Sequence, residues 1–317
     1  RWVFRTATGK QLNGGTQPAA TARLQGGCTD VYRYYDEYPG EWTKNDNNPE
    51  ISEKPVEALA APRVGCIIGA DGKFYNNVDD AKSANGGKDA IAFVTALNGT
   101  HRVEAGQDYN GLAICLKTID QVPWAEGDFN DCGDEMILHP SDSEIGYYKD
   151  KSGKKVYVSS EKNGIYFTDY LADGCKGRGH NHPAAKASRY TVFEGNNDFS
   201  HTFMPSIGQF ILAMKGVGID WDEAWGFGNH KMPNRDAAKE QQQVAAARTL
   251  LENSGCGITV TNPMWTSAKS ANRTSVCVFM YNYTTMVDNL FFIDGVQSLP
   301  SSRPFIAFKY NGGATED

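Results

Sequence analysis

The chain has 317 residues, of which 40% are hydrophobic and 22% charged, so it is long enough and apolar enough to bury a substantial core. This balance excludes a disordered polar chain. A formal net charge of −7 argues against a broad phosphate-binding surface, so we expect no nucleic-acid partner. No stretch approaches the roughly 18 apolar residues of a membrane helix, so we expect no membrane insertion.

Residues 1–62 are predicted to form a β-rich extension or small module. Short aromatic segments, Trp2–Phe4 and Val31–Tyr35, alternate there with turn-rich stretches such as Lys44–Pro49. A linker is expected near residues 52–62. The remaining residues, 63–317, are predicted to form the main domain.

Three short apolar runs bounded by Gly, Asp and Asn predict buried strands at Val64–Ile68, Ala90–Val94 and Gly111–Leu116. Residues 124–179 are polar and rich in Gly and Asp. They are predicted to form a β-rich insertion, with strands at Lys155–Val158 and Ile165–Phe167.

Helices are predicted after this insertion. Ser206 can cap a helix through its hydroxyl while Gln209 reaches back to the backbone amide of Ser206. The expected helices are Ala184–Tyr190, a second from Ser206 to before Gly216, and Asp236–Asn253. Further strands are expected at Val276–Tyr281, Leu290–Ile293 and Pro304–Lys309. Strands, then helices, then strands indicate an α+β domain.

The seven cysteines are odd in number and contain no CxxC pair, which disfavours a zinc ribbon or a disulfide framework. Cys115 and Cys277 lie in apolar runs, where a thiol packs as a small hydrophobe. Most cysteines are therefore expected to be free, which suggests folding in a reducing compartment. A disulfide between Cys132 and Cys175 remains an open alternative.

The segment Asp128–Glu135 partly resembles a calcium loop. Asp128, Asn130 and Asp134 would offer oxygen ligands, which a hard cation requires. Cys132 occupies a position where oxygen is expected, and no glutamate follows at the required distance. A solvated turn is the favoured interpretation, and calcium the weaker one.

Cys175, His180 and His182 lie close in sequence and resemble part of a zinc site, but no fourth ligand is evident. A loop is favoured over a metal site. No GxSxG elbow, P-loop or HExxH motif occurs. The sequence therefore nominates no catalytic residue and no cofactor.

The stretch from Ala271 to Phe292 is rich in Tyr and Asn, and its strand signals are repeatedly interrupted. Tyr and Asn are residues that dominate paratope loops, so this composition indicates a binding surface. The candidate ligand-binding residues are Asn272, Arg273, Tyr281, Asn282, Tyr283, Asp288, Asn289 and Phe291. The alternative is that these are ordinary strand and hairpin residues, half of them pointing into a core.

Three signatures in the last third carry a resemblance to a known family. They are a helix entry at Met204-Pro205-Ser206, a turn at Trp265-Thr266-Ser267 and a terminal strand at Arg303-Pro304-Phe305. Together with Gly111-Leu112-Ala113-Ile114, they resemble C-type-lectin-fold domains of gut Bacteroidales proteins and their phages. Related forms occur in the variable proteins of diversity-generating retroelements and in the sulfatase-modifying-factor family. The resemblance covers about residues 64–310.

This resemblance implies a C-type-lectin-like fold whose hypervariable positions would lie within Ala268–Ser302. Thr266 departs from the usual serine. The Trp-Asn-Asp and Glu-Pro-Asn triplets of calcium-dependent sugar-binding lectins are absent, so calcium-mediated sugar binding is not expected. Cys256 and Cys277 do not match the closely spaced cysteine pair of the oxidase branch.

We therefore expect a non-enzymatic protein that binds a protein or cell-surface ligand. The resemblance implies display on a phage particle or bacterial cell surface, with diversification by a retroelement as a further expectation. One alternative is an oxidase of the sulfatase-modifying-factor type. Another is a structural pilus or capsid-decoration subunit, whose exposed aromatic side chains would contact neighbouring subunits. The sequence does not set the oligomeric state.

Overall fold

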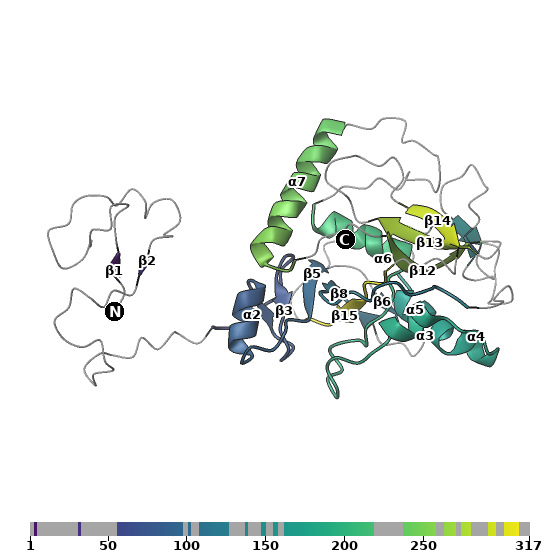
Figure 1. The fold of residues 1–317 in the computed structure, drawn as a ribbon, viewed down its shortest axis with the longest axis horizontal. Helices are drawn as coiled ribbons and strands as arrows, with labels where there is room; N and C mark the ends of the chain where they lie inside the picture. Colours follow the sequence, from purple (N-terminus) through teal and green to yellow (C-terminus); the bar gives the residue numbers. More distant parts are fainter. Residues whose placement is uncertain are drawn as a thin grey trace. The chain divides into compact units, whose positions relative to one another are not determined.

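The structure, a computed structural model, describes residues 56–97, 108–126, 162–218, 237–257 and 301–310 continuously and short strands elsewhere. The chain divides into two compact units, Arg1–Val56 and Glu57–Asp317. In the first unit, β1 (Val3–Phe4) pairs antiparallel with β2 (Val31–Tyr32). The second unit combines helices with antiparallel sheet, as the α+β prediction required (Figure 1).

A five-stranded antiparallel sheet forms the core of the second unit, in the order β15-β8-β5-β3-β4. Phe305 of the last strand lies opposite Ile114, and Phe308 lies opposite Gly111. The predicted early core strands and the predicted terminal strand are therefore confirmed, with slightly different ends. The five strands are β3 (Ile67–Ile68), β4 (Phe74–Tyr75), β5 (Ala92–Ala96), β8 (Gly111–Cys115) and β15 (Phe305–Phe308).

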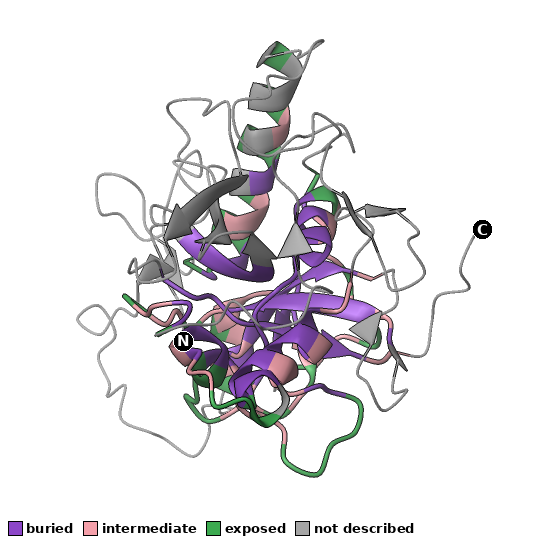
Figure 2. Cartoon of the chain, turned by 90° about the vertical axis from the view of Figure 1, so that its right-hand side faces the viewer, coloured by how far each residue is buried: buried purple, intermediate pink, exposed green. Residues whose placement is uncertain are grey.

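Both faces of this sheet are covered, which explains why its central strands are almost continuously apolar. On one face Phe305 packs against Phe210 of α6 (Ile207–Gly216), with ring centroids 6.1 Å apart. On the other face Ile306 and Phe308 pack in a cluster with Phe199. The buried strands and helices lie together at the centre of this unit (Figure 2).

Helix α6 begins with the predicted capping box. The Ser206 hydroxyl accepts a hydrogen bond from the Gln209 amide at 3.2 Å, and Gln209 Oε1 accepts one from the Ser206 amide at 3.0 Å. At the other end of α6, a Cβ at Gly216 would overlap the carbonyl oxygen of Thr95. Glycine therefore allows the helix to approach β5 closely.

The other two predicted helices are also present, with ends within two residues of those expected. They are α5 (Pro183–Ser188) and α7 (Ala237–Ser254). A short helix that was not predicted, α2 (Val78–Ala84), has Asn77 as its N-cap. Asn77 Oδ1 accepts from the Asp80 amide at 2.7 Å, and this N-cap was the available signal.

The strand predicted at Ile165–Phe167 is wrong, because these residues belong to α3 (Gly164–Ala172). Aromatic and β-branched residues favoured a strand, but Ile165, Thr168 and Leu171 recur at helical spacing and are buried. A short α4 (Gly174–Gly177) follows. The region predicted as a β-rich insertion therefore also contributes helices.

In the described part of the second unit, two short antiparallel pairs lie outside the two larger sheets. The predicted strand near Lys155 is observed as β11 (Lys155–Tyr157), which pairs with β10 (Tyr147–Lys149). Likewise, β6 (His101–Arg102) pairs with β7 (Asp108–Tyr109). Among the described helices, none combines the length and apolar character needed to cross a bilayer.

A second sheet has the order β14-β13-β12-β9. Only the β12 to β9 pairing is parallel. The Trp265-Thr266-Ser267 signature lies inside β12, so its prediction as a turn is wrong. The strands are β9 (Ile137–Leu138), β12 (Pro263–Ser270), β13 (Thr274–Phe279) and β14 (Phe291–Gly295).

Replacing Ser206 by Ala removes the acceptor for the Gln209 amide at a buried helix start. We expect a loss of about 1 kcal/mol in the free energy of unfolding, measured by urea denaturation. Ser83→Ala, at an exposed position of α2, is the matched control and should change stability by less than about 0.5 kcal/mol. Equal effects of the two changes would contradict the role of the capping box.

Candidate functional site

The three signatures, far apart in sequence, meet in space. Phe203 and Phe305 exchange backbone hydrogen bonds of 2.9 and 2.8 Å. The Ser267 amide donates to the Pro205 carbonyl at 2.9 Å. The Trp265 amide donates to the Ser301 carbonyl at 3.0 Å, beside a parallel bridge from Met264 to Ser301. The two ends of the predicted variable interval, 268–302, are therefore held at neighbouring points of one buried junction.

Two buried tryptophans fix the outgoing end of the interval. The Trp265 indole donates to the Val122 carbonyl at 2.7 Å, and the Trp124 indole donates to the Thr266 carbonyl at 3.0 Å. Both side chains are fully buried, so each pairs its one polar group while filling the core. The sequence analysis missed Trp124 because it lies at the edge of a polar stretch; the apolar run Val122–Ala125 was the available signal.

Arg303 and Ser302 fix the returning end. Arg303 donates to the carbonyls of Cys115 and Leu116, each at 3.4 Å, at the end of β8. Burial lowers the pKa of the Arg303 guanidinium, which nevertheless stays charged as arginine does in proteins. Ser302 exchanges backbone hydrogen bonds of 2.7 and 2.8 Å with Ile119, and its hydroxyl lies 2.7 Å from that of Ser188. The segment that leads into β15 is thus held by hydrogen bonds of both its backbone and its side chains.

The chain from Trp265 to Arg303 contains most of β12 and all of β13 and β14. The predicted ligand-binding residues fall into two groups, one in each connection between these strands. Asn272 and Arg273 lie in the connection from Ser270 to Thr274. The connection from Phe279 to Phe291 starts at the other end of β13, because β13 runs antiparallel to both β12 and β14. A strand such as β13 spans roughly 17 Å, so the two connections start from opposite ends of the sheet.

The second connection holds most of the candidate residues, Tyr281, Asn282, Tyr283, Asp288 and Asn289. These residues, like Asn272 and Arg273, lie outside the described part of the chain. Phe291 is the first residue of β14 and lies opposite Val278. The structure therefore describes the two strand ends that flank the predicted binding surface, Phe279 of β13 and Phe291 of β14.

The structure bears differently on the predicted calcium segment and on the predicted zinc cluster. Asp128, Asn130 and Asp134 lie outside the described residues. Cys175 is disulfide-bonded, so it cannot supply the thiolate that the zinc alternative requires. Across the described residues, no group of three or more His, Cys, Asp or Glu side chains is arranged to hold a metal ion.

Among the four cysteines whose side chains the structure describes, three are free, in agreement with the expectation that most are free. Cys66, Cys115 and Cys256 are buried free thiols. Burial raises the pKa of Cys115 to about 12, so its thiol is not a nucleophile at neutral pH. The disulfide at Cys175 is the exception.

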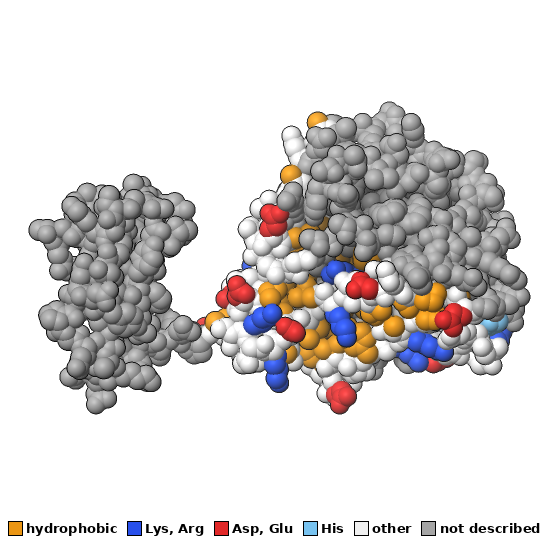
Figure 3. Space-filling model, in the orientation of Figure 1, with side chains coloured by type: hydrophobic (Ala, Val, Ile, Leu, Met, Phe, Trp, Pro, Cys, Tyr) orange, Lys and Arg blue, Asp and Glu red, His pale blue; other side chains and the backbone are white. Residues whose placement is uncertain are grey.

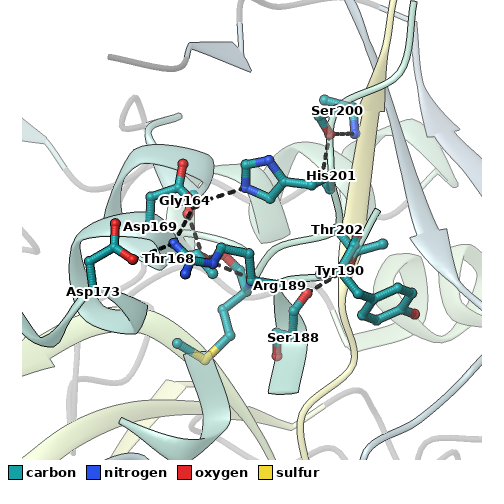
Figure 4. A network of polar contacts seen from close by, with 12 residues as sticks. Gly164, Thr168, Asp169, Asp173, Ser188, Arg189, Tyr190, Ser200, His201 and Thr202 are labelled. Carbon is teal, nitrogen blue, oxygen red and sulfur yellow. Dashed lines mark hydrogen bonds and ion pairs between the residues drawn. The ribbon is translucent and has the colours of Figure 1, made fainter. Parts of the chain in front are cut away.

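A network of polar side chains that was not predicted joins α3 to the segment after α5 (Figure 4). Arg189 contacts Asp173 at 2.8 Å and Asp169 at 3.4 Å, and His201 Nε2 lies 3.0 Å from Asp169. The two ion pairs of Arg189 are partly exposed and are each worth about 1 kcal/mol or less. They link α3 to the segment that pairs with β15. On the face that Figure 3 shows, acidic and basic side chains of the described residues are interspersed.

Comparison with protein-family models, with curated proteins and with solved structures finds no match to this chain. The residues of the chain itself therefore have to indicate its function, above all those of the junction that holds both ends of the interval 268–302.

We expect Trp265→Phe to lower the free energy of unfolding by about 1–3 kcal/mol, because the Val122 carbonyl would be left buried without its donor. Trp124→Phe should act similarly on the Thr266 carbonyl. If the two indoles stabilise one junction, their effects in a double-mutant cycle measured by urea denaturation will not add. Additive effects would show that the two indoles stabilise the fold independently.

In the folded protein at pH 8, iodoacetamide should fail to alkylate Cys115, because its thiol is buried and its pKa is raised to about 12. Mass spectrometry of the tryptic peptide 103–117 measures this labelling. The same protein in guanidinium chloride is the control and should be fully labelled. Rapid labelling of the folded protein would contradict the burial of this thiol.

Proposed function

We propose that this chain is a non-enzymatic ligand-binding protein, in which a C-type-lectin-like scaffold displays the interval 268–302 to a protein or cell-surface ligand. The observation that carries the proposal is that Trp265 and Ser301 are hydrogen-bonded in the buried junction. A scaffold that fixes both ends of a segment tolerates replacement of the residues between them. Functional residues on such segments are positioned by the rigid elements beneath.

The chemistry of the interval supports recognition rather than catalysis. Residues 280–290 contain two Tyr, two Asn, two Thr and one Asp, with no Lys or Arg. Tyrosine supplies rigid contact area, and asparagine supplies adaptable hydrogen bonds. Such a surface suits a neutral, polar partner surface better than a phosphate-rich one.

The sheet topology sharpens which residues would act together. Asn272 and Arg273 belong to the connection at one end of β13, and Tyr281 and Tyr283 to the connection at the other. A small ligand patch would contact one end only. We assign the main surface to residues 280–290, the longer connection, and give Asn272 and Arg273 a separate or minor role.

Display outside the bacterial cytoplasm, on a cell surface or a phage particle, is part of the proposal, and so is diversification by a retroelement. Diversification can be tested in the DNA next to the gene. We expect an adenine-rich near-repeat of the codons for Ala268–Ser302, beside a reverse-transcriptase gene. Absence of both would remove the retroelement from the proposal but leave ligand binding to be tested separately.

Ligand binding is tested with fluorescently labelled protein on a panel of intact bacterial cells, read by flow cytometry. We expect Tyr281→Ala with Tyr283→Ala to weaken binding at least about tenfold, because aromatic residues dominate binding hot spots. The stability of this variant should change by less than about 1 kcal/mol.

The matched control is Asn272→Ala with Arg273→Ala, at the other end of β13, which should keep most of the binding. Unchanged binding by the tyrosine variant would contradict the proposal. A loss of stability as large as that of Trp265→Phe would place the tyrosines in the core and would also contradict it.

A further inference from the structure

Cys175 forms a disulfide that the proposed function does not use. The residue is fully buried, in a cluster that also contains Trp124, Ala184 and Met204. Its sulfur lies 3.3 Å from Nε2 of His182, whose ring packs edge-on against Trp124. Because thiol–disulfide exchange requires a thiolate to reach a sulfur atom, neither an oxidant nor a reductant can act on Cys175 while this cluster is closed.

The cluster around Cys175 is built from segments that are distant in sequence. Trp124, α3, α5 and Trp265 all contribute to it. The indoles of Trp124 and Trp265 donate to carbonyls of each other's segments. The cluster therefore closes together with the junction, and before it closes the sulfur of Cys175 is accessible.

Burial leaves two other cysteines reduced. Cys66 and Cys115 are as buried as Cys175 but remain thiols, and they pack with Val94 and Ile306 in a separate cluster on the main sheet. Burial raises the pKa of both thiols, so neither offers a thiolate once the sheet is packed. Burial thus protects a thiol from oxidation, and the oxidised state of Cys175 requires that an oxidant reach it before its own cluster closes.

The partner of Cys175 is Cys28, Cys132 or Cys277, because the three other cysteines of the chain are free. The side chains of these three lie outside the described part of the chain, so the pair of Cys132 and Cys175 stays a prediction. Oxidation before closure is required with any of the three, since it depends on the surroundings of Cys175 alone.

We propose that the Cys175 disulfide is formed by a thiol–disulfide oxidant that acts on the chain before the cluster around Trp124 closes, and that closure then seals the bond. The thiolate of one cysteine attacks the oxidant's disulfide and forms a mixed disulfide. The thiolate of the second cysteine then displaces the oxidant, which leaves in its reduced, thiol form. The chain thereby loses two protons and two electrons, which the oxidant carries away.

Such a step places folding in an oxidising compartment, because glutathione and thioredoxin keep cytosolic thiols reduced. The oxidising compartment replaces the expected reducing one and agrees with the proposed display outside the cytoplasm. It does not depend on ligand binding.

The order of oxidation and burial is measured by refolding the full chain, reduced and denatured, in a glutathione redox buffer at pH 8. At each time point, light iodoacetamide labels accessible thiols, and heavy iodoacetamide in guanidinium chloride then labels buried thiols. After reduction, N-ethylmaleimide labels the cysteines that were in disulfides. Mass spectrometry of tryptic peptide 163–176 reads the state of Cys175, and peptide 103–117 reads that of Cys115 as an internal control.

We expect Cys175 to pass from the light label directly to N-ethylmaleimide, whereas Cys115 passes from the light label to the heavy one. Accumulation of the heavy label at Cys175 before its disulfide appears would show burial before oxidation and would overturn the proposal. Failure of N-ethylmaleimide to appear at Cys175, in the refolded chain or in chain exported to the bacterial periplasm, would overturn it as well.

Sealing is tested by treating the native, exported protein with dithiothreitol. Reduction at Cys175 should be at least about a hundredfold slower than in guanidinium chloride, because it requires the cluster to open. Equal rates would contradict the seal.

Variants assign the seal to one cluster. Met204→Ala, which leaves a cavity in the cluster of Cys175, should speed this reduction at least about tenfold. The matched control Val94→Ala, in the cluster of Cys115, should instead speed the labelling of Cys115. Equal acceleration at Cys175 by both variants would show that the bond opens only with the whole fold and would overturn sealing by this cluster.

Discussion

The backbone pairing that joins Phe203 to Phe305, Pro205 to Ser267 and Ser301 to Trp265 is the interaction on which the rest of the second unit depends. It brings together the start of α6, the middle of β12 and the start of β15, which are separated by long stretches of chain. Each segment also satisfies buried polar groups of another, which must be paired once water is excluded. The main sheet, the second sheet and α6 are thereby fixed to one another.

The side chains at this junction explain why these residue types occur there. Trp124 and Trp265 each fill a large volume and donate one hydrogen bond to the other's segment. At the returning end, Arg303 donates to two carbonyls at the end of β8, which an apolar side chain could not do. Because these groups are buried, the junction holds both ends of the interval 268–302.

The same region shows how covalent and ionic links add to packing. Helix α3 is held to the rest of the unit by the buried cluster around Trp124 and by the ion pair between Asp169 and Arg189, and the disulfide at Cys175 follows it. The ion pairs are partly exposed and contribute little individually, whereas the buried apolar residues contribute most of the stability. Helix α3, which lies within the polar region 124–179, is therefore packed against the buried core around Trp124 and Trp265.

The sequence by itself determined the elements whose signals are local. The capping box at Ser206, the continuous apolar runs of β5 and β8 and the terminal strand at Phe305 depend on neighbouring residues, and they were predicted. Only the tertiary structure decided between the competing strand and helix signals at Ile165–Phe167, placed Trp265 in a strand and divided the candidate residues between the two ends of β13. These outcomes depend on which distant segment covers a residue or pairs with its backbone, and no window of sequence contains that information.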